Sequence, residues 1–152
     1  MLSMFTFESI LIFALLLGLS LSIGSFVGMA SYRIPQKMNI GKTDYPYLLG
    51  GRSHCPQCNQ VLRNRDLIPI LSFLLLKGKC FFCNKKISSR YLLIELATCG
   101  CFLTCILASN DNLVRITLFC FMVGLLLSST IDIEHGLLPD QITLPLLWIG
   151  LI

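Results

Sequence analysis

The sequence predicts an all-α polytopic membrane protein: a helical bundle with a small zinc-ribbon-like loop domain between its first and second spans. Three observations predict this class. The 152 residues are 55% hydrophobic and only 13% charged, with a mean hydropathy of +0.76. Long apolar runs recur along the chain, and two matched cysteine pairs lie in a basic segment between the first two runs. A soluble domain of this size cannot bury so much apolar surface, so lipid is its expected solvent.

The first expected transmembrane helix is residues 1–32. Its core, Ser9–Tyr32, holds 24 residues without a charge and is rich in leucine and isoleucine. As a helix, this run is long enough to cross about 30 Å of hydrocarbon. Glu8 is the single charge before it, and neither a basic start nor a small-residue cleavage site is present, so we interpret it as a permanent span rather than a cleaved signal peptide.

Three further runs predict the rest of the bundle. Residues 91–110 carry a single charge, Glu95. Residues 113–131 contain 16 consecutive uncharged residues, which is short for a span, so we expect the ends of this helix at the water interface or within neighbouring protein. A fourth run, 141–152, reaches the last residue without a polar end and is interpreted as a truncated span.

The segment 33–90 is expected to be a zinc-knuckle domain because it carries two copies of the pattern Cys-Xaa-Xaa-Cys-Asn. The copies are Cys55 with Cys58, and Cys80 with Cys83. The following asparagines, Asn59 and Asn84, tolerate the left-handed backbone that such turns need. The pattern favours a structural, tetrahedral zinc site, while a disulfide or redox pair and free thiols stay open as alternatives. The apolar stretch Leu67–Leu76 is too short to span and should pack on the knuckles or lie at the membrane interface.

The basic residues predict the orientation. Eleven of the twelve Lys and Arg residues lie between Arg33 and Arg90, together with the acidic Asp44 and Asp66, so this segment has a net charge of +9. The positive-inside rule places it in the cytoplasm, where thiols stay reduced and zinc is favoured over disulfides. Membrane flanks and the thiolate charge account for the basic residues, so we expect a lipid bilayer and no nucleic acid as partner.

Two features inside the expected spans concern packing. Gly24 and Gly28 form a small-xxx-small step that lets another helix approach closely. Glu95, about one turn into its helix, is an intramembrane carboxylate that needs a partner or a task. We expect Arg90 or Lys86 to neutralise it, in preference to a direct catalytic role.

Acidic residues gather after the third uncharged run. Asp132 should lie at the cytoplasmic mouth of its helix, with Glu134 and Asp140 close behind it in the sequence. Partial desolvation and neighbouring negative charge favour the protonated form of such a carboxylate. An aspartic peptidase needs two carboxyl groups that share a proton. The alternative is that all three are ordinary solvated charges, and the charge pattern alone leaves both interpretations open.

The chain resembles the type IV prepilin peptidase family of bacterial inner membranes, the bifunctional leader peptidases and N-methyltransferases. The order and spacing of several short motifs carry the resemblance, which runs from the first span to the last residue. The motifs are Gly24-Ser25-Phe26, Tyr32-Arg33-Ile34-Pro35, Arg52-Ser53-His54-Cys55-Pro56-Gln57-Cys58, Ile68-Pro69-Ile70-Leu71-Ser72, Gly78-Lys79-Cys80 with Cys83, Ile87-Ser88-Ser89-Arg90-Tyr91 leading to Glu95, and Asp132 with Leu138-Pro139-Asp140.

The resemblance implies a membrane aspartic peptidase. It implies cleavage of the basic leader of prepilins or pseudopilins, followed by N-methylation of the new amino terminus with S-adenosylmethionine. Asp132 corresponds to the first catalytic aspartate, and residues 91–152 to the start of the peptidase membrane domain. The cysteine domain is linked to the methyltransferase function in this family. Glu134 and Asp140 are candidate contacts for the basic leader rather than catalytic groups.

The sequence departs from the family at the second catalytic aspartate. This residue follows a Gly-Xaa-Gly motif in a later span, and no Gly-Xaa-Gly-Asp occurs here. We therefore interpret the chain as the front half of the enzyme, with its C-terminal half missing, and expect no peptidase activity from it alone. A smaller departure is Ser89, where the family commonly has proline. No glycine-rich nucleotide motif locates the methyl donor.

Two other functions remain as alternatives. A membrane thiol-disulfide oxidoreductase also combines helices with paired cysteines, but its reactive pairs face the oxidising side of the membrane, opposite to the side that the charges predict here. A non-catalytic zinc-ribbon adaptor that binds a partner protein in the membrane is the other alternative.

Overall fold

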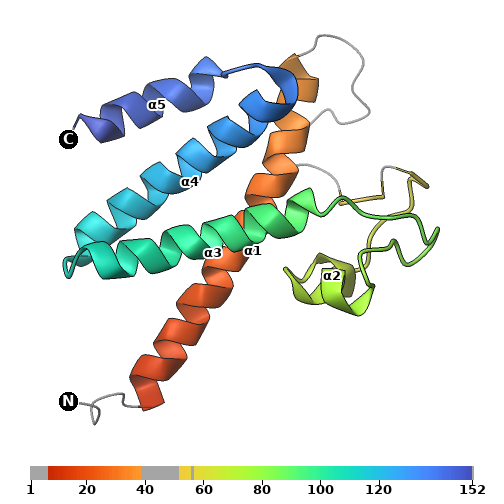
Figure 1. Ribbon diagram of the computed structural model, residues 1–152, viewed down its shortest axis with the longest axis horizontal. Coiled ribbons are helices and arrows are strands. Elements are labelled where there is room, and N and C mark those ends of the chain that lie inside the picture. The colour runs from red at the N-terminus through yellow and green to blue at the C-terminus, as the bar shows by residue number, and fades with distance from the viewer. Residues whose placement is uncertain (1–6, 39–51, 56, 152) are drawn as a thin grey trace.

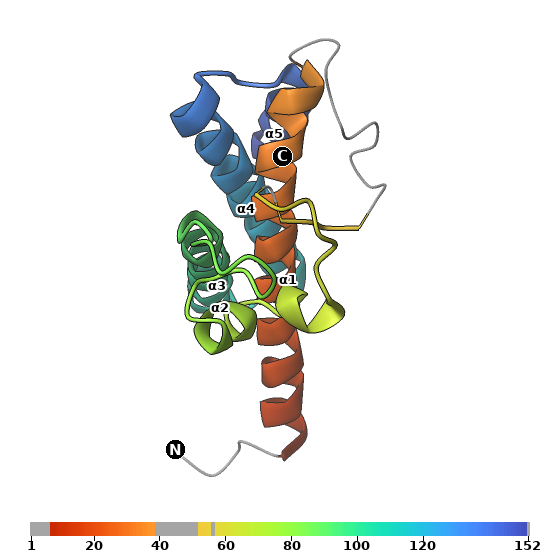
Figure 2. The ribbon, with the colours of Figure 1, turned by 90° about the vertical axis from the view of Figure 1, so that its right-hand side faces the viewer.

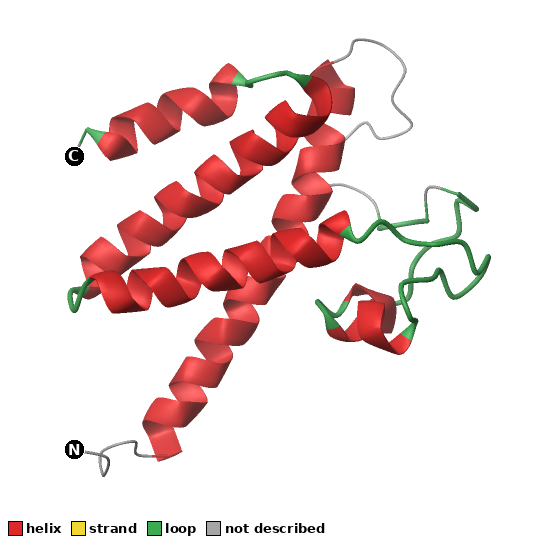
Figure 3. Cartoon of the chain, viewed as in Figure 1, coloured by secondary structure: helices red, strands yellow, loops and turns green. Residues whose placement is uncertain are grey.

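The computed structural model describes residues 7–38, 52–55 and 57–151, except for the side chains of residues 36–38. Its elements, in chain order, are α1 (Phe7–Met38), the short 3-10 helix η1 (Asn64–Leu67), α2 (Leu71–Leu75), α3 (Arg90–Ala108), α4 (Asn112–His135) and α5 (Asp140–Gly150) (Figure 1). Over the described residues these helices are joined by loops, and no strand is present (Figure 3). The predicted all-α class is confirmed.

Among the described residues, three helices are long and apolar enough to cross a membrane: Phe7–Pro35, Arg90–Ala108 and Asn112–His135. Within the most apolar 18 residues of each helix, at most 22% are buried inside the protein. Side chains such as Leu15 and Leu107 are 65% and 86% exposed. So much exposed apolar surface is expected where lipid, not protein, covers the helix. The protein is therefore a multi-pass membrane protein.

The spanning helices pack closely where α1 carries small residues. Figures 1 and 2 show α3 crossing α1 near its middle, with α4 and α5 stacked on the far side of α3 from the cysteine loop. A Cβ atom added at Gly24 would lie 2.8 Å from the Cα of Glu95, and one added at Gly28 would lie 3.1 Å from the Tyr91 ring. The predicted close approach at the small-xxx-small step is confirmed, and the partner is α3.

Two helices end later than the apolar runs indicated. α1 continues to Met38, past the expected end at residue 32. α4 continues through Asp132 to His135 and is closed by Gly136, which has φ +59° and donates its N–H to the Asp132 carbonyl at 2.8 Å. Loss of hydrophobicity does not stop a helix, whereas a left-handed glycine does. Consequently Asp132 lies in the last helical turn.

Candidate metal centre and carboxylate sites

The two cysteine pairs form two copies of one backbone turn. In the first, the Asn59 N–H donates to the Cys55 carbonyl at 2.9 Å; in the second, the Asn84 N–H donates to the Cys80 carbonyl at 3.0 Å. Asn59 and Asn84 have φ of 54° and 53°, the left-handed conformation that the repeat predicted. Each turn is flanked by an isolated antiparallel bridge, His54 with Val61 and Lys79 with Lys86.

The four sulfurs converge on one point between the turns. The Sγ atoms of Cys55, Cys58, Cys80 and Cys83 all lie within 4.8 Å of one another. The Cys55 and Cys83 sulfurs are 3.9 Å apart. A tetrahedral zinc with Zn–S bonds of about 2.3 Å requires sulfurs about 3.8 Å apart. All four cysteines are free thiols, so the residues present fit a metal ion held by four sulfurs.

The protonation of the thiols is uneven. Burial raises the pKa of Cys55, but hydrogen bonds from the backbone at Gln57 and Cys58 outweigh it and lower the pKa to about 7. A backbone hydrogen bond at Gln60 lowers the pKa of Cys58, but burial and the neighbouring sulfurs raise it to about 11. One thiolate therefore forms easily and suppresses ionisation of the next. A divalent cation would displace the remaining protons.

Arg63 contacts both the second cysteine turn, at Phe81, and η1, at Asp66. Its guanidinium lies 3.4 Å from the centroid of the Phe81 ring and pairs with Asp66 at 3.1 Å. The Arg63 side chain, through this hydrogen bond, holds the pKa of Asp66 below its usual value. On the other side of the knuckle, a Cβ atom at Gly78, which has φ +67°, would lie 2.9 Å from the Phe73 ring. The apolar stretch Leu67–Leu76 thus packs on the knuckles, as one of the two expectations proposed.

Glu95 is buried, with 7% of its surface exposed, and its partner is a backbone group. Its Oε2 accepts a hydrogen bond from the Ile70 N–H at 2.8 Å. The prediction that Arg90 or Lys86 neutralises Glu95 is wrong among the described residues, because Arg90 binds Glu134 instead. Five residues along a helix correspond to a rotation of about 140° beyond a full turn, so Arg90 and Glu95 face different directions.

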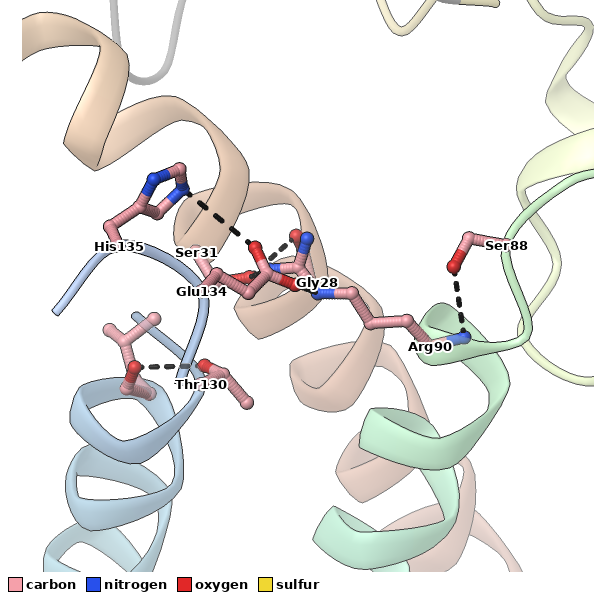
Figure 4. A network of polar contacts seen from close by, with 8 residues as sticks. Gly28, Ser31, Ser88, Arg90, Thr130, Glu134 and His135 are labelled. Atoms are coloured by element: carbon pink, nitrogen blue, oxygen red, sulfur yellow. Dashed lines mark hydrogen bonds and ion pairs between the residues drawn. The ribbon is translucent and has the colours of Figure 1, made fainter. Parts of the chain in front are cut away.

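Arg90 joins three helices at one end of the bundle. Its Nε lies 2.5 Å from the Glu134 carboxylate on α4, and its Nη2 donates to the Ser31 hydroxyl on α1 at 2.8 Å. His135 adds a longer contact of 3.8 Å to the same carboxylate. Figure 4 shows this clamp, in which Arg90 reaches from the start of α3 to Ser31 on α1 and Glu134 near the end of α4. Sequence reasoning did not predict the clamp, because its members are far apart along the chain.

Asp132 and Asp140 stay at the surface. Asp132 is exposed on the last turn of α4, and among the described residues no side chain pairs with its carboxylate. Asp140 is the exposed first residue of α5, across the turn that follows Gly136. Glu134 lies two residues from Asp132 but points to Arg90. The structure therefore gathers the four cysteines into one site. The three predicted carboxylates do not form one site: Glu134 pairs with Arg90, whereas Asp132 and Asp140 are exposed.

A cavity of about 200 Å³ lies between α1, α3 and the cysteine module. Its walls include the Glu95 carboxylate, the rings of Tyr32, Tyr91, Phe73 and Phe81, and the metal-site residues Cys55 and Cys80. Sequence reasoning did not predict this cavity, because its walls come from three separate segments.

The fold and sites define a class: a polytopic membrane protein with a four-cysteine metal module between its first two spanning helices and an acidic end on the third. Residues 18–109 match the Bacterial Peptidase A24 N-terminal domain, and residues 119–152 match the Type IV leader peptidase family. The chain belongs to the type IV leader peptidase family, and the resemblance inferred from its motifs is confirmed.

Curated relatives are similar over most of this chain. The prepilin leader peptidase/N-methyltransferase of Dichelobacter nodosus is 36% identical over 152 residues, which cover 88% of this chain and 53% of the relative. The type 4 prepilin-like proteins leader peptide-processing enzyme of Escherichia coli O78:H11 is 39% identical, covering 87% and 53%. The Dickeya chrysanthemi prepilin leader peptidase/N-methyltransferase is 39% identical, covering 97% and 57%. The chain spans about half the length of these relatives. No solved structure matches it.

Proposed function

We propose that this chain forms part of a membrane aspartic endopeptidase that removes the leader of type IV prepilins or pseudopilins and N-methylates the new amino terminus. The supporting observation is the position of Asp132. It is an exposed carboxylate on the last turn of a spanning helix, without a basic partner among the described residues, in the segment that matches the family. A permanent arginine partner would have kept this group ionised; Arg90 pairs with Glu134 instead.

In this proposal Asp132 is one member of a proton-sharing pair. One carboxylate takes a proton from the attacking water, and the other protonates the scissile carbonyl or the leaving amine. The second carboxylate belongs to the region of the relatives that these 152 residues do not cover. Asp132 alone supplies half of the dyad, so these residues by themselves should not cleave a leader.

We propose that the sites lie on the cytoplasmic side of the membrane, and the Arg90 clamp and the charge support this. Because Arg90 begins α3 and contacts Ser31 in the C-terminal part of α1 and Glu134 in the last turn of α4, these three parts of the helices lie on one side. The segment of net charge +9 joins two of them, and the positive-inside rule makes this side cytoplasmic. In a bacterial inner membrane, Asp132 would then lie where the hydrophobic helix of the substrate enters the bilayer from the cytoplasm.

The metal that we propose is zinc in a structural role. Four sulfur ligands fill a tetrahedral shell and leave no position for a reactive water. The methyl transfer requires S-adenosylmethionine, which supplies an electrophilic methyl group when bound. Of the two acidic residues proposed to contact the basic leader, Asp140 is exposed, whereas the Glu134 charge is already compensated by Arg90. We therefore expect Asp140 to contribute more than Glu134 to leader binding.

The test is Asp132→Asn in the full-length enzyme that contains these residues, assayed for prepilin processing in membranes. Leader removal should be abolished while membrane insertion and zinc content stay normal. Glu8→Gln, an exposed carboxylate in the first turn of α1, is the matched control and should process normally. Near-normal processing by Asp132→Asn would refute the assignment and favour the non-catalytic adaptor. Thiol labelling from each side of the membrane distinguishes the peptidase and the adaptor from an oxidoreductase, whose reactive cysteine pairs would be labelled from the oxidising side.

A further inference from the structure

Glu95 is a buried carboxylate for which the described residues provide neutral hydrogen-bond donors. The Ile70 N–H donates to it at 2.8 Å, and the Ser25 hydroxyl also hydrogen-bonds to it. Among the described residues no lysine, arginine or histidine forms an ion pair with it. A buried carboxylate normally has a cationic partner, because desolvation of an unpaired charge is costly. Glu95 therefore has the capacity to receive a positive charge that this segment does not provide.

The backbone around Glu95 is arranged to hold the carboxylate in place. Ile70, a β-branched residue, has φ of 59° and ψ of −51°, a conformation that costs free energy for such a side chain. In this conformation its N–H points at Glu95. From the opposite side, Gly24 contacts the Glu95 backbone so closely that no Cβ atom fits. The carboxylate is thus positioned by α1 and by the cysteine module together.

Glu95 lines the cavity between α1, α3 and the cysteine module, whose other walls combine aromatic rings with aliphatic, hydroxyl and charged side chains, Arg33 among the charged ones. The Tyr32, Tyr91 and Phe73 rings line it, and Phe81, which is 50% exposed, lines it as well. A carboxylate together with aromatic faces is the chemistry that binds an organic cation, by charge and by cation–π attraction. The Arg63 guanidinium covers one face of the Phe81 ring, and the exposed half of this residue is the surface on which a planar base can stack.

We propose that this cavity is the methyl-donor site, with Glu95 receiving the positive charge of S-adenosylmethionine. The inference rests on the methyltransferase part of the proposed function. The donor is a sulfonium cation that carries an adenine ring, and the residues present fit both groups. A volume of about 200 Å³ suits the sulfonium and amino-acid portion, with the adenine directed toward Phe81. Because Cys55 and Cys80 line the same cavity, the zinc module supports one of its walls.

The test measures ligand binding, not turnover. Radiolabelled S-adenosylmethionine and its product, S-adenosylhomocysteine, whose thioether sulfur lacks the positive charge, are titrated by equilibrium dialysis against the purified full-length enzyme. Glu95→Gln keeps the size of the side chain and removes its charge. It should weaken binding of the cation about tenfold or more while changing binding of the neutral thioether less than about twofold. Ser72→Phe, which places a ring in the cavity, should weaken binding of both ligands.

Glu8→Gln is the matched control and should bind both ligands like the unmodified enzyme. Zinc content and leader cleavage, measured on each variant, report folding and the peptidase part of the proposed function independently. Unchanged binding of the donor by both Glu95→Gln and Ser72→Phe would overturn the inference while leaving the methyltransferase function intact. Equal losses of both ligands in Glu95→Gln would overturn the role of the charge. An unmodified enzyme that cleaves leaders but binds no donor would overturn the methyltransferase function and this site with it.

Discussion

Replacing Gly24 by alanine should disrupt the contact between α1 and α3 that positions Glu95. The alanine Cβ atom would lie 2.8 Å from the Glu95 Cα and 3.0 Å from the Thr98 hydroxyl oxygen. The nearest of these atoms belongs to backbone and cannot rotate away, so one helix must move. Overpacking of this kind typically costs about 1–3 kcal/mol of unfolding free energy. We expect Gly24→Ala to fall within that range.

Two glycines on the same helix provide matched controls. A Cβ atom at Gly28 would lie 3.1 Å from a ring carbon of Tyr91, and a side chain can shift by a few tenths of an ångström. Nothing lies within 4 Å of the corresponding position at Gly18. Gly28→Ala should therefore cost less than Gly24→Ala, and Gly18→Ala should change the unfolding free energy by no more than about 0.5 kcal/mol.

The assay is equilibrium unfolding of the purified protein in mixed micelles of a mild detergent and SDS, followed by circular dichroism. The order of stability should be Gly18→Ala, then Gly28→Ala, then Gly24→Ala as the least stable. Equal stabilities of Gly24→Ala and Gly18→Ala would refute the close approach of α1 and α3. Gly24→Ala should also weaken binding of S-adenosylmethionine, because Glu95 moves with α3.

Two further predictions concern the clamp and the metal. Arg90→Gln or Glu134→Gln alone should lower the unfolding free energy by about 1–2 kcal/mol, because each leaves a partly buried charge without its counter-ion. The double variant should lose less unfolding free energy than the sum of the two single losses. Strictly additive losses would contradict a direct interaction between the two side chains. Removing the metal with a strong chelator should release a single zinc per chain and expose residues 57–88 to proteolysis, because metal binding is coupled to folding of the knuckles. An unchanged digestion pattern, or a purified protein without zinc, would contradict the structural metal site.

The clamp connects the two sites that the proposed function uses. Arg90 begins the helix that carries Glu95, and its guanidinium binds the carboxylate two residues after Asp132. The cavity and the proposed catalytic carboxylate are thereby attached to one rigid junction of α1, α3 and α4. In the proposed function, this arrangement would place leader cleavage and N-methylation near the same end of one substrate.

Features that depend on a few consecutive residues were predictable. Spanning helices follow from uninterrupted apolar runs, because the cost of burying charge in hydrocarbon acts on each segment separately. The paired cysteines predicted the metal site, and the asparagines after them predicted the left-handed turns, because both are properties of a single turn. The end of α4 was harder to predict. Hydropathy indicated the end of the span, whereas the helix itself ends at Gly136.

The partners of the charges could not be predicted in the same way. Proximity in the sequence suggested Arg90 for Glu95, yet a helix of 3.6 residues per turn directs these side chains apart. Arg90 instead meets Glu134, and Glu95 meets the backbone of Ile70. Both contacts join segments that are separated by tens of residues: one links α3 to α4, and the other links the residue before α2 to α3.

The sequence by itself determined which segments are apolar enough to enter the membrane, which cysteines could hold a metal and which family the chain resembles, since each depends on local composition or spacing. Only the tertiary structure decided that Glu134 is held by Arg90, that Asp132 remains without a basic partner among the described residues, and that Glu95 faces a cavity behind the metal module. The physical reason is that electrostatic pairing falls steeply with distance in space, and distance in space is established only when the helices pack.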